Sequence, residues 1–350
     1  MKDQIAIPCS IYRGGTSKAV LFLASDLPSD IEKRKDILLR VMGSPDIRQI
    51  DGLGGADPLT SRVGIISQGA SDVIRFHFAL VHIKKPIVEF EGFCGNIISA
   101  VAPFAISQGL IQGVEPLTHV SIYDVNTKIG VTADVAVKDG EPLSKGDYHI
   151  AGVPRGGSKI ALHFHHPCQH VVLLPSHQAC DVLHTTFGMI EVSLIHCIDP
   201  VVFVRACDVG LQGDERPDQL ATNRDSLEKL EELRRLGAQK MGIPCSGSLP
   251  KVVFIAPSTK QGSLQARMLA LGMMHKAYAI SCGSCTAAAA FVSGSLVNQI
   301  VKTPVDSITI HHPQGDMEIG VRKKVQNLLD IEEIIVYRTA RLIMQGHVYI

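Results

Sequence analysis

Two long stretches of the chain carry no charged residue, and each of them predicts a helix that is buried on all sides. The stretches are residues 92–114 and residues 277–301, and both begin near a cysteine and a glycine. Burial on every face explains the missing charge, and close contact with strands explains the many small side chains. We therefore predict two similar halves, each built around a central helix.

A membrane span is the alternative interpretation of both stretches, because each is long enough and free of Asp, Glu, Lys and Arg. The first stretch, however, contains Asn, Gln, Pro and several Gly, and the second contains many Ser and Gly besides Asn298 and Gln299. These residues are too polar for a lipid environment. Central helices surrounded by sheet are the better prediction.

Short alternating apolar segments predict strands over most of the remaining chain, for example at residues 73–82 and 252–256. Residues 31–42 have amphipathic spacing and predict a helix. Residues 226–241 place leucines among many charges, which predicts a helix that covers a sheet and faces solvent. Residues 262–277 are interpreted as a further helix.

The predicted fold class is α+β, with two similar domains that each wrap a curved, mostly antiparallel sheet around a central helix. Few linkers mark a boundary, and we place it close to residues 174–177, midway between the uncharged stretches. The expected domains are residues 1–182, with the Cys94 helix, and 183–350, with a helix at 282–294. A return of the C-terminal strand to the first domain stays open.

Composition is that of a cytoplasmic globular protein. The 350 residues are 45% hydrophobic and 19% charged, which suffices for two domains with their own cores. With 34 basic and 34 acidic residues the net charge is zero, so a basic surface for nucleic acid is not expected. The N-terminus lacks an apolar run and predicts a strand, not a signal peptide. Nine scattered cysteines suit reduced thiols.

Cysteines near the starts of the two predicted helices are the first candidates for chemistry. Unpaired N–H groups at a helix N-terminus bind carboxylates and favour the thiolate of a nearby cysteine. Cys94 stands in this position in the first half. In the second half, Cys282 and Cys285 form a C-x-x-C pair. The interpretations of these two cysteines are a redox pair, half of a zinc site, and small residues of the core, and the last is preferred.

Several polar loops are candidate ligand sites. Residues 13–18 are followed by an apolar strand and lack the Gly-Lys-Ser/Thr ending of a nucleotide-binding loop, which leaves a carboxylate cradle or a hairpin turn. Residues 51–62 hold three glycines, which let backbone approach a ligand, but alone they indicate an unspecific turn. Residues 311–315 predict a hairpin bend. Four histidines and Cys168 within residues 163–170 indicate either a metal site or a polar surface; the latter is preferred.

Taken together, these motifs resemble the PrpF family of cofactor-independent isomerases, which includes methylaconitate and methylitaconate isomerases and oxalomesaconate tautomerase. The resemblance spans nearly the whole chain and rests on residues 13–18, 42–46, 48–52, 54–57, 60–61, 94–97, 210–217, 275–279, 294–299, 312–315 and 338–341. It implies a fold similar to diaminopimelate epimerase and proline racemase, with the site between two domains. It also implies an unsaturated di- or tricarboxylic acid as partner, no metal, no organic cofactor, and no role for nucleic acid or membrane. The oligomeric state stays open, with a homodimer as one alternative.

The resemblance assigns roles to particular residues. Cys94 matches the catalytic cysteine that acts as acid and base, and Thr16 and Ser17 match the contacts to a substrate carboxylate. Gly95 and Asn96 would add N–H donors at the helix start. The expected substrate-binding set is completed by Gly54, Gly55, Ser281 and His312, although a lone loop histidine is more often merely exposed.

Arg62 is the second catalytic candidate beside Cys94, and it departs from the family pattern, in which a lysine usually follows Thr-Ser. A guanidinium stays protonated, so it clamps a carboxylate but shuttles protons poorly. Either Cys94 works as a single base, or the chain is a catalytically silent carboxylate-binding homologue. A C-x-x-C oxidoreductase ranks far behind both. Phe93 and residues 174–178 also differ from the pattern.

Overall fold

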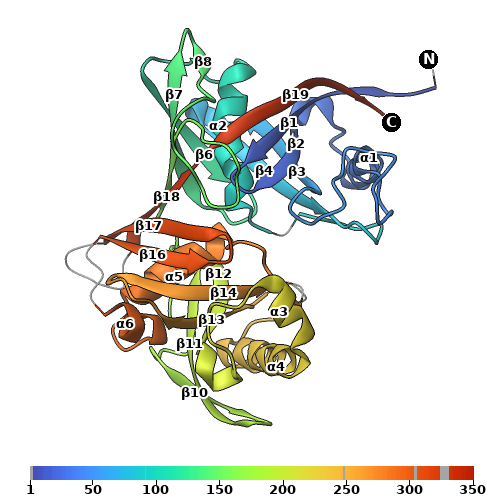
Figure 1. The fold of residues 1–350 in the computed structure, drawn as a ribbon. Helices are drawn as coiled ribbons and strands as arrows, with labels where there is room; N and C mark the ends of the chain where they lie inside the picture. Colours follow the sequence, from blue (N-terminus) through green and yellow to red (C-terminus); the bar gives the residue numbers. More distant parts are fainter. Residues whose placement is uncertain (1–2, 91, 247–248, 271, 303–305, 324–330) are drawn as a thin grey trace. The chain divides into compact units, whose positions relative to one another are not determined.

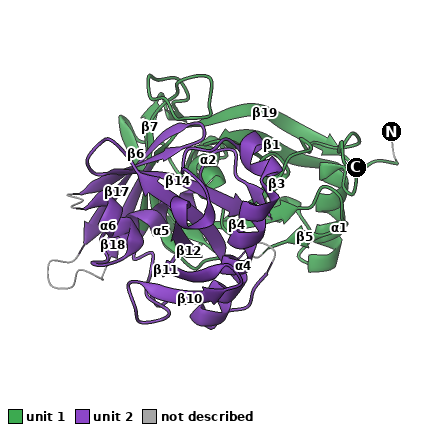
Figure 2. Cartoon of the chain, turned by 60° about the horizontal axis from the view of Figure 1, so that its bottom comes forward, with its two compact units in different colours: residues 1–164, 337–350 green, residues 165–336 purple. Residues whose placement is uncertain are grey.

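The structure is a computed structural model that describes residues 3–90, 92–246, 249–270, 272–302, 306–323 and 331–350. By its internal contacts the chain divides into two compact units (Figure 2). Unit 1 comprises Met1–Phe164 and Tyr337–Ile350, and unit 2 comprises His165–Val336. The C-terminal strand therefore belongs to the first unit. This division differs from the single boundary expected after residue 182.

Unit 1 is built on strands that surround one helix, α2 (Gly95–Ser107) (Figure 1). Its strands are β1 (Ala6–Gly14), β2 (Ser17–Leu23), β3 (Arg62–Gln68), β4 (Ile74–Val81), β5 (Val88–Glu89), β6 (Leu117–Asp124), β7 (Gly130–Lys138), β8 (Glu141–Pro142), β9 (Ile160–His165) and β19 (Ala340–Tyr349). β19 pairs with β1, which forms a hairpin with β2. β2 and β3 are parallel, β3 and β4 antiparallel, β4 and β6 parallel, and β6 and β7 antiparallel.

Helix α2 is the buried central helix that its missing charge predicted. All residues from Gly95 to Ile106 are buried, and strands β1–β4, β6–β8 and β19 contact it. The other face of the sheet carries α1 (Ile31–Met42), which the Asp30 side chain caps by accepting from the Lys33 N–H at 2.8 Å. Leu38 and Met42 of α1 pack into a core cluster with strands β2 and β3. The sheet of unit 1 is thus covered on both faces.

Unit 2 repeats this plan. Its strands are β10 (Asp181–Thr185), β11 (Gly188–Cys197), β12 (Asp199–Arg205), β13 (Lys251–Pro257), β14 (Ser263–Ala270), β15 (Met273–Met274), β16 (Ser307–His312), β17 (Gly315–Lys323) and β18 (Ile331–Arg338), the last of which runs into unit 1. Helices α5 (Ile280–Ala290) and α6 (Leu296–Val301) pack on these strands. Every residue of α5 is buried.

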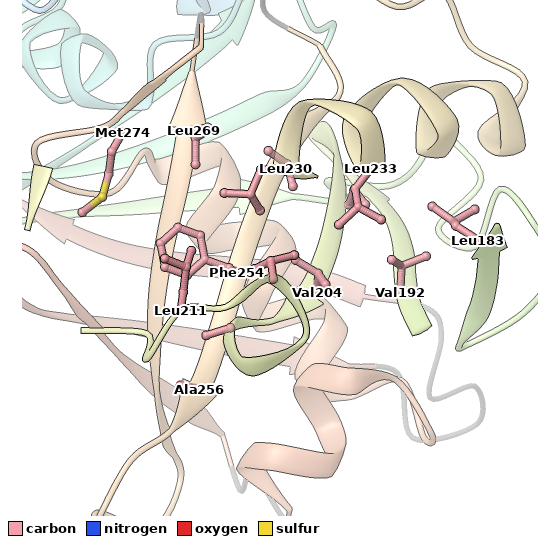
Figure 3. Packing of buried hydrophobic residues seen from close by; sticks show 14 of the residues in the cluster. Leu183, Val192, Val204, Leu211, Leu230, Leu233, Phe254, Ala256, Leu269 and Met274 are labelled. Carbon is pink, nitrogen blue, oxygen red and sulfur yellow. The ribbon is translucent and has the colours of Figure 1, made fainter. Parts of the chain in front are cut away.

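The outer face of the unit 2 sheet is covered by α3 (Pro217–Thr222) and α4 (Arg224–Met241). Leu230 and Leu233 of α4 are fully buried, and they point toward Phe254 and Val204 of the sheet (Figure 3). The sequence prediction of a cover helix over residues 226–241 is thus confirmed, with leucines toward the sheet and charges toward solvent.

The strand order confirms the prediction of two similar halves. In unit 1 a hairpin is followed by a parallel step, an antiparallel pair, a second parallel step and another antiparallel pair, from β1 to β7. Unit 2 has the same succession in β11, β12, β13, β14, β16 and β17. Helix α2 links β4 to β6, and α5 with α6 links β14 to β16. The two central helices therefore occupy equivalent places in the two units.

The helix predicted over residues 262–277 was wrong, because this segment forms β14 and β15. Leu264, Ala266 and Met268 are buried at alternating positions, and β14 pairs with β13 on one side and with β16 on the other. Helix-favouring residues are thus overruled by pairing on both edges. Separately, within the described residues no helix is both long enough and apolar enough to cross a membrane.

Candidate active site

Cys94 lies directly at the start of the central helix of unit 1, as its N-cap residue. Its backbone carbonyl accepts the first intrahelical hydrogen bond, from the Ile98 N–H at 3.1 Å. The N–H groups of Gly95, Asn96 and Ile97 precede this bond and are therefore the donors at the helix end. The Cys94 side chain is only 2% exposed. The thiol thus sits in a buried position at the positive end of a helix dipole.

Arg62 contacts this thiol directly. Its Nη1 group donates a hydrogen bond to Cys94 Sγ, and its Nε group donates to the Pro58 carbonyl at 2.9 Å. The guanidinium carbon also lies 5.8 Å from the centre of the Phe78 ring. Arg62 begins β3, where its side chain shares a face of the sheet with Ala19 and Ser17 of β2. The sequence-predicted catalytic pair is therefore in contact.

The hairpin that follows β1 packs against the first turn of α2. A methyl group on Gly14 would lie 2.5 Å from the Asn96 carbonyl oxygen, so only glycine allows this approach. Gly15 has φ +52°, and a methyl group there would lie 2.1 Å from Asn96 Oδ1. At the tip of the hairpin, Thr16 Oγ1 accepts a hydrogen bond from Asn96 Nδ2 at 3.1 Å. The predicted hairpin turn thus stands beside the Cys94 helix.

Ser17 follows the turn and is 2% exposed. Its hydroxyl makes no hydrogen bond to any of the residues that the structure describes. A buried hydroxyl without a partner costs about 1–3 kcal/mol, so such a group calls for a partner such as a bound water, an ion or a ligand. Ser17 therefore fits a polar contact to a small molecule at the start of α2.

The glycine-rich loop before Arg62 is organised around Gln49. The Gln49 amide donates to Ser61 Oγ at 2.7 Å and accepts from the Ala56 N–H at 2.9 Å. Methyl groups on Gly54 and Gly55 would lie 2.3 Å from Gln49 Oε1 and from Thr60 Oγ1, respectively. Close packing inside the loop thus accounts for both glycines. Their contact with substrate stays a prediction.

Three arginines surround the first turn of α2. Arg13 Nη1 donates to the carbonyls of Gly15 and Thr339 at 3.0 and 2.9 Å, and Arg338 Nε donates to Asn96 Oδ1 at 3.2 Å. Burial lowers the pKa of Arg338 to about 10, and burial followed by the Arg341 charge lowers the pKa of Arg13. Both remain cationic at neutral pH. With Arg62 and the helix dipole they favour an anion at this place.

The equivalent helix of unit 2 begins at Ile280 and offers different chemistry. Ser281 is 3% exposed, and Cys282 and Cys285 are fully buried. Burial raises the pKa of Cys282 to about 12 and raises the pKa of Cys285 well above its usual value. These thiols are therefore protonated at neutral pH, as core residues would be. The structure describes each unit by itself, so a shared site for Ser281 and Cys94 stays a prediction.

The histidines singled out in the sequence are placed in different surroundings. His312 is 6% exposed at the end of β16, and its expected contact with substrate stays a prediction. His163 Nε2 lies 3.1 Å from Asp134 Oδ2, whereas His165 Nδ1 lies 3.7 Å from Glu333 Oε1. Across the described part of the chain, no three His, Cys, Asp or Glu side chains are grouped to hold a metal ion.

Sequence reasoning missed two residues that organise the site, Gln49 and Arg338. Both stand within motifs that carried the family resemblance, but their partners are distant in sequence or depend on a loop conformation.

A cavity of about 230 Å³ borders Phe104 and Gln108 near the other end of α2, so it is separate from the Cys94 position.

Comparisons with known proteins show the family to which the sequence is similar. The sequence profile of the family described as PrpF protein matches residues 4–350. A 3-methylitaconate isomerase of Eubacterium barkeri is 37% identical over 377 residues, which cover 100% of this chain and 98% of that protein. A (4E)-oxalomesaconate Delta-isomerase of Novosphingobium is 35% identical, with 100% of this chain and 99% of that protein covered.

Solved structures support the same relationship. A crystal structure of a methylitaconate-delta-isomerase superposes with a TM-score of 0.85 at 36% identity and covers 99% of this chain and 96% of its own. A probable proline racemase from Agrobacterium radiobacter shares the fold at a TM-score of 0.58 and 14% identity, with 98% of this chain and 92% of that chain covered. The predicted α+β, epimerase-like fold is thereby confirmed. From the profile match over nearly its full length, the chain belongs to the PrpF protein family.

Proposed function

We propose that the protein is an isomerase that moves a proton between carbons of an unsaturated di- or tricarboxylic acid, of the methylaconitate, methylitaconate or oxalomesaconate type. The observation that carries the proposal is the contact between Arg62 and Cys94 at the N-terminus of α2. It joins a nucleophilic side chain, a fixed cation and helix N–H donors in one place. The names of the relatives agree with this chemistry.

In the proposed mechanism the Cys94 thiolate removes a proton from a carbon next to a carboxylate or an unsaturated bond. The C–H bond breaks, an S–H bond forms, and the electron pair spreads through the double bond into the carboxylate. The thiol then returns the proton to a different carbon, so no net gain or loss of atoms or electrons occurs. Positioned acid–base groups contribute about two to four orders of magnitude to such steps.

The neighbouring groups stabilise the negative charge that develops. The helix N–H donors, the hydroxyls of Thr16 and Ser17, and the Arg62 guanidinium are all suited to carboxylate oxygens. A guanidinium binds charge without exchanging protons, so Cys94 acts as the single base.

Turnover assays with a panel of acids test the proposal. The methylaconitate, methylitaconate and oxalomesaconate isomers would each be incubated with the protein and followed by proton NMR. Conversion of at least one acid by the wild type, and loss of conversion in Cys94→Ala, is the expected result. If none of the acids is converted and none raises the Tm, the proposed function is refuted.

The second candidate is a carboxylate-binding homologue without catalysis, and it is favoured by Arg62 at the position where the family usually has lysine. A binder would show a substrate-dependent rise in Tm but no conversion. The same panel therefore separates the two candidates, because the enzyme gives both signals.

A further inference from the structure

The C-terminal segment of unit 1 reaches the first turn of α2 and contributes Arg338 to it. The carbonyl of Thr339, the next residue, accepts hydrogen bonds from the Gly15 N–H at 3.0 Å and from Arg13 Nη1 at 2.9 Å. These bonds hold the segment against the hairpin of residues 14–17. Arg338 itself is only 6% exposed. A cation is thus buried within bonding distance of the helix that begins at Cys94.

Arg338 fixes the orientation of the Asn96 side chain. A guanidinium has only donors, so the Asn96 atom that it contacts must be the carbonyl oxygen, Oδ1, at 3.2 Å. The amide group, Nδ2, then necessarily faces the other way, where it donates to Thr16 Oγ1 at 3.1 Å. If residue 338 carried no hydrogen-bond donor, its side chain would favour neither orientation of the Asn96 amide.

The orientation of Asn96 in turn determines what Thr16 offers. Because Thr16 Oγ1 accepts the bond from Asn96, its own hydroxyl proton stays available for another acceptor. A reversed amide would accept that proton and withdraw it. The neighbouring Ser17 hydroxyl is buried and has no partner among the described residues. The Thr16 and Ser17 hydroxyls thus each keep a proton for an acceptor outside the described residues.

We propose that Arg338 is a positioning residue for substrate binding: through Asn96 it directs the hydroxyl proton of Thr16 toward a substrate carboxylate. The inference rests on the proposed function, because it assigns a role within the same site. It does not make Arg338 a catalytic residue, since the residue acts through Asn96. A side chain that served only to fill space would not need a charge at a site where burial is costly.

A double-mutant cycle between Arg338 and Thr16 tests the proposal. Arg338→Met removes the donor, and Thr16→Val removes the hydroxyl while keeping the shape. Each single variant is expected to raise KM about ten- to a hundredfold, with a smaller effect on kcat. In the double variant, Arg338→Met should add no more than about threefold to the effect of Thr16→Val. If the KM of the double variant rose by the product of the two single increases, the two residues would act independently and the proposal would be overturned.

Two further variants guard against a purely structural effect. Arg338→Lys keeps the charge and a donor, so it should fold even if Arg338→Met does not. Its KM should lie between the values of the wild type and Arg338→Met. If Arg338→Met does not fold, the double-mutant cycle is measured with Arg338→Lys and Thr16→Val. Arg341→Met is the matched control, since Arg341 is an exposed arginine of the same segment. It should leave KM within about twofold, as surface substitutions usually do. An equal rise in KM for Arg341→Met would contradict a specific role of Arg338.

Asn96→Asp tests the middle of the chain of contacts. The carboxylate keeps the acceptor for Arg338 and adds an ion pair, but it has no donor for Thr16. We expect a Tm at least equal to that of the wild type together with a raised KM. An unchanged KM would show that Asn96 orients nothing of importance to the substrate.

Failure of the proposed function can be distinguished from failure of the inference about Arg338. If wild-type protein neither converts nor binds any acid of the panel, with cis-aconitate as an additional calorimetric probe, then the function is wrong whatever Arg338 does. A crystal structure of Arg338→Met, or of Arg338→Lys if Arg338→Met does not fold, decides in that case whether Arg338 orients Asn96. Loss of the Asn96–Thr16 bond supports it, and an unchanged bond overturns it.

Discussion

The starts of α2 and α5 occupy equivalent places in two units with the same strand order, yet their cysteines differ in chemical setting. Both helices are buried on all sides. Cys94 receives a hydrogen bond from Arg62. Cys282, by contrast, lies in surroundings whose burial raises its pKa to about 12. A repeated fold therefore places thiols at corresponding helices in different surroundings.

The cation beside Cys94, Arg62, explains the different settings of the two cysteines better than the helix dipole does. Both thiols lie within the first turn of a helix and share its dipole. The charges that act on the pKa of Cys282 are Lys251, which lowers it, and Asp199, which raises it, and both matter less than burial. Those two residues also pair with each other at 2.5 Å. A donor in direct contact, as at Cys94, is thus the feature that marks the candidate acid–base residue.

Replacing the two cysteines in turn gives the largest contrast between the helices. Cys94→Ser should reduce turnover by about two to four orders of magnitude while the fold is retained, because the acid–base group is lost. Cys282→Ala should change turnover by no more than a few fold. Steady-state rates and circular dichroism of the two variants provide the check. Near-wild-type turnover by Cys94→Ser would remove this residue from the mechanism.

Alkylation of thiols tests the assignment of Cys282 as an inert core residue. A pKa of about 12 instead of 9.0 lowers the thiolate fraction about a thousandfold at neutral pH. Iodoacetamide should therefore leave Cys282 and Cys285 unmodified in the native protein and modify both in denaturant, as measured by peptide mass mapping. Rapid native labelling of Cys282 would mean that the two helix starts are chemically alike.

Arg62 variants separate binding from proton transfer. Arg62→Ala should raise KM about ten- to a hundredfold, the usual contribution of a charge-assisted hydrogen bond. Arg62→Lys should keep the affinity nearly unchanged and raise the isomerisation rate, because a lysine beside Cys94 can exchange a proton and a guanidinium cannot. Should both variants abolish an activity that the wild type has, the guanidinium is adapted to this protein's own substrate.

Two glycines at opposite ends of the α2 region give the smallest effect. Gly15 and Gly109 both have positive φ, +52° and +71°, but only Gly15 faces a neighbour, since a methyl group on Gly109 would meet nothing within 4 Å. Gly109→Ala should cost about 1 kcal/mol of unfolding free energy from backbone strain alone. Gly15→Ala should cost more and also impair turnover, because Asn96 is displaced. Equal costs in urea unfolding would contradict the tight packing of the hairpin on α2.

The sequence predicted those features whose cause is local. Missing charge over residues 92–114 identified a helix buried on all sides, and leucine spacing identified α4 as a cover helix. The contact of Arg62 with Cys94 was anticipated only through the family resemblance. Strand β14 was mistaken for a helix, since its pairing on both edges depends on distant segments.

Arg338 was missed for the same reason as β14. Arg338 and Asn96 are 242 positions apart in the sequence, and the residues next to Arg338 give no indication of their contact. Similarly, Gln49 becomes a centre of hydrogen bonds only after the loop before Arg62 has closed around it. Residues that act through long-range contacts are thus visible in the fold and hidden in local patterns.

Solvent deuterium exchange tests the central claim most directly, because it reports the proton transfer itself. A responsive acid from the panel would be incubated in D₂O with the wild type, Cys94→Ala and Cys282→Ala, and deuterium would be located by NMR and mass spectrometry. We predict incorporation at the exchanging carbon with the wild type and with Cys282→Ala, and none above background with Cys94→Ala. Incorporation that persists without the Cys94 thiol would contradict its role as the acid–base residue.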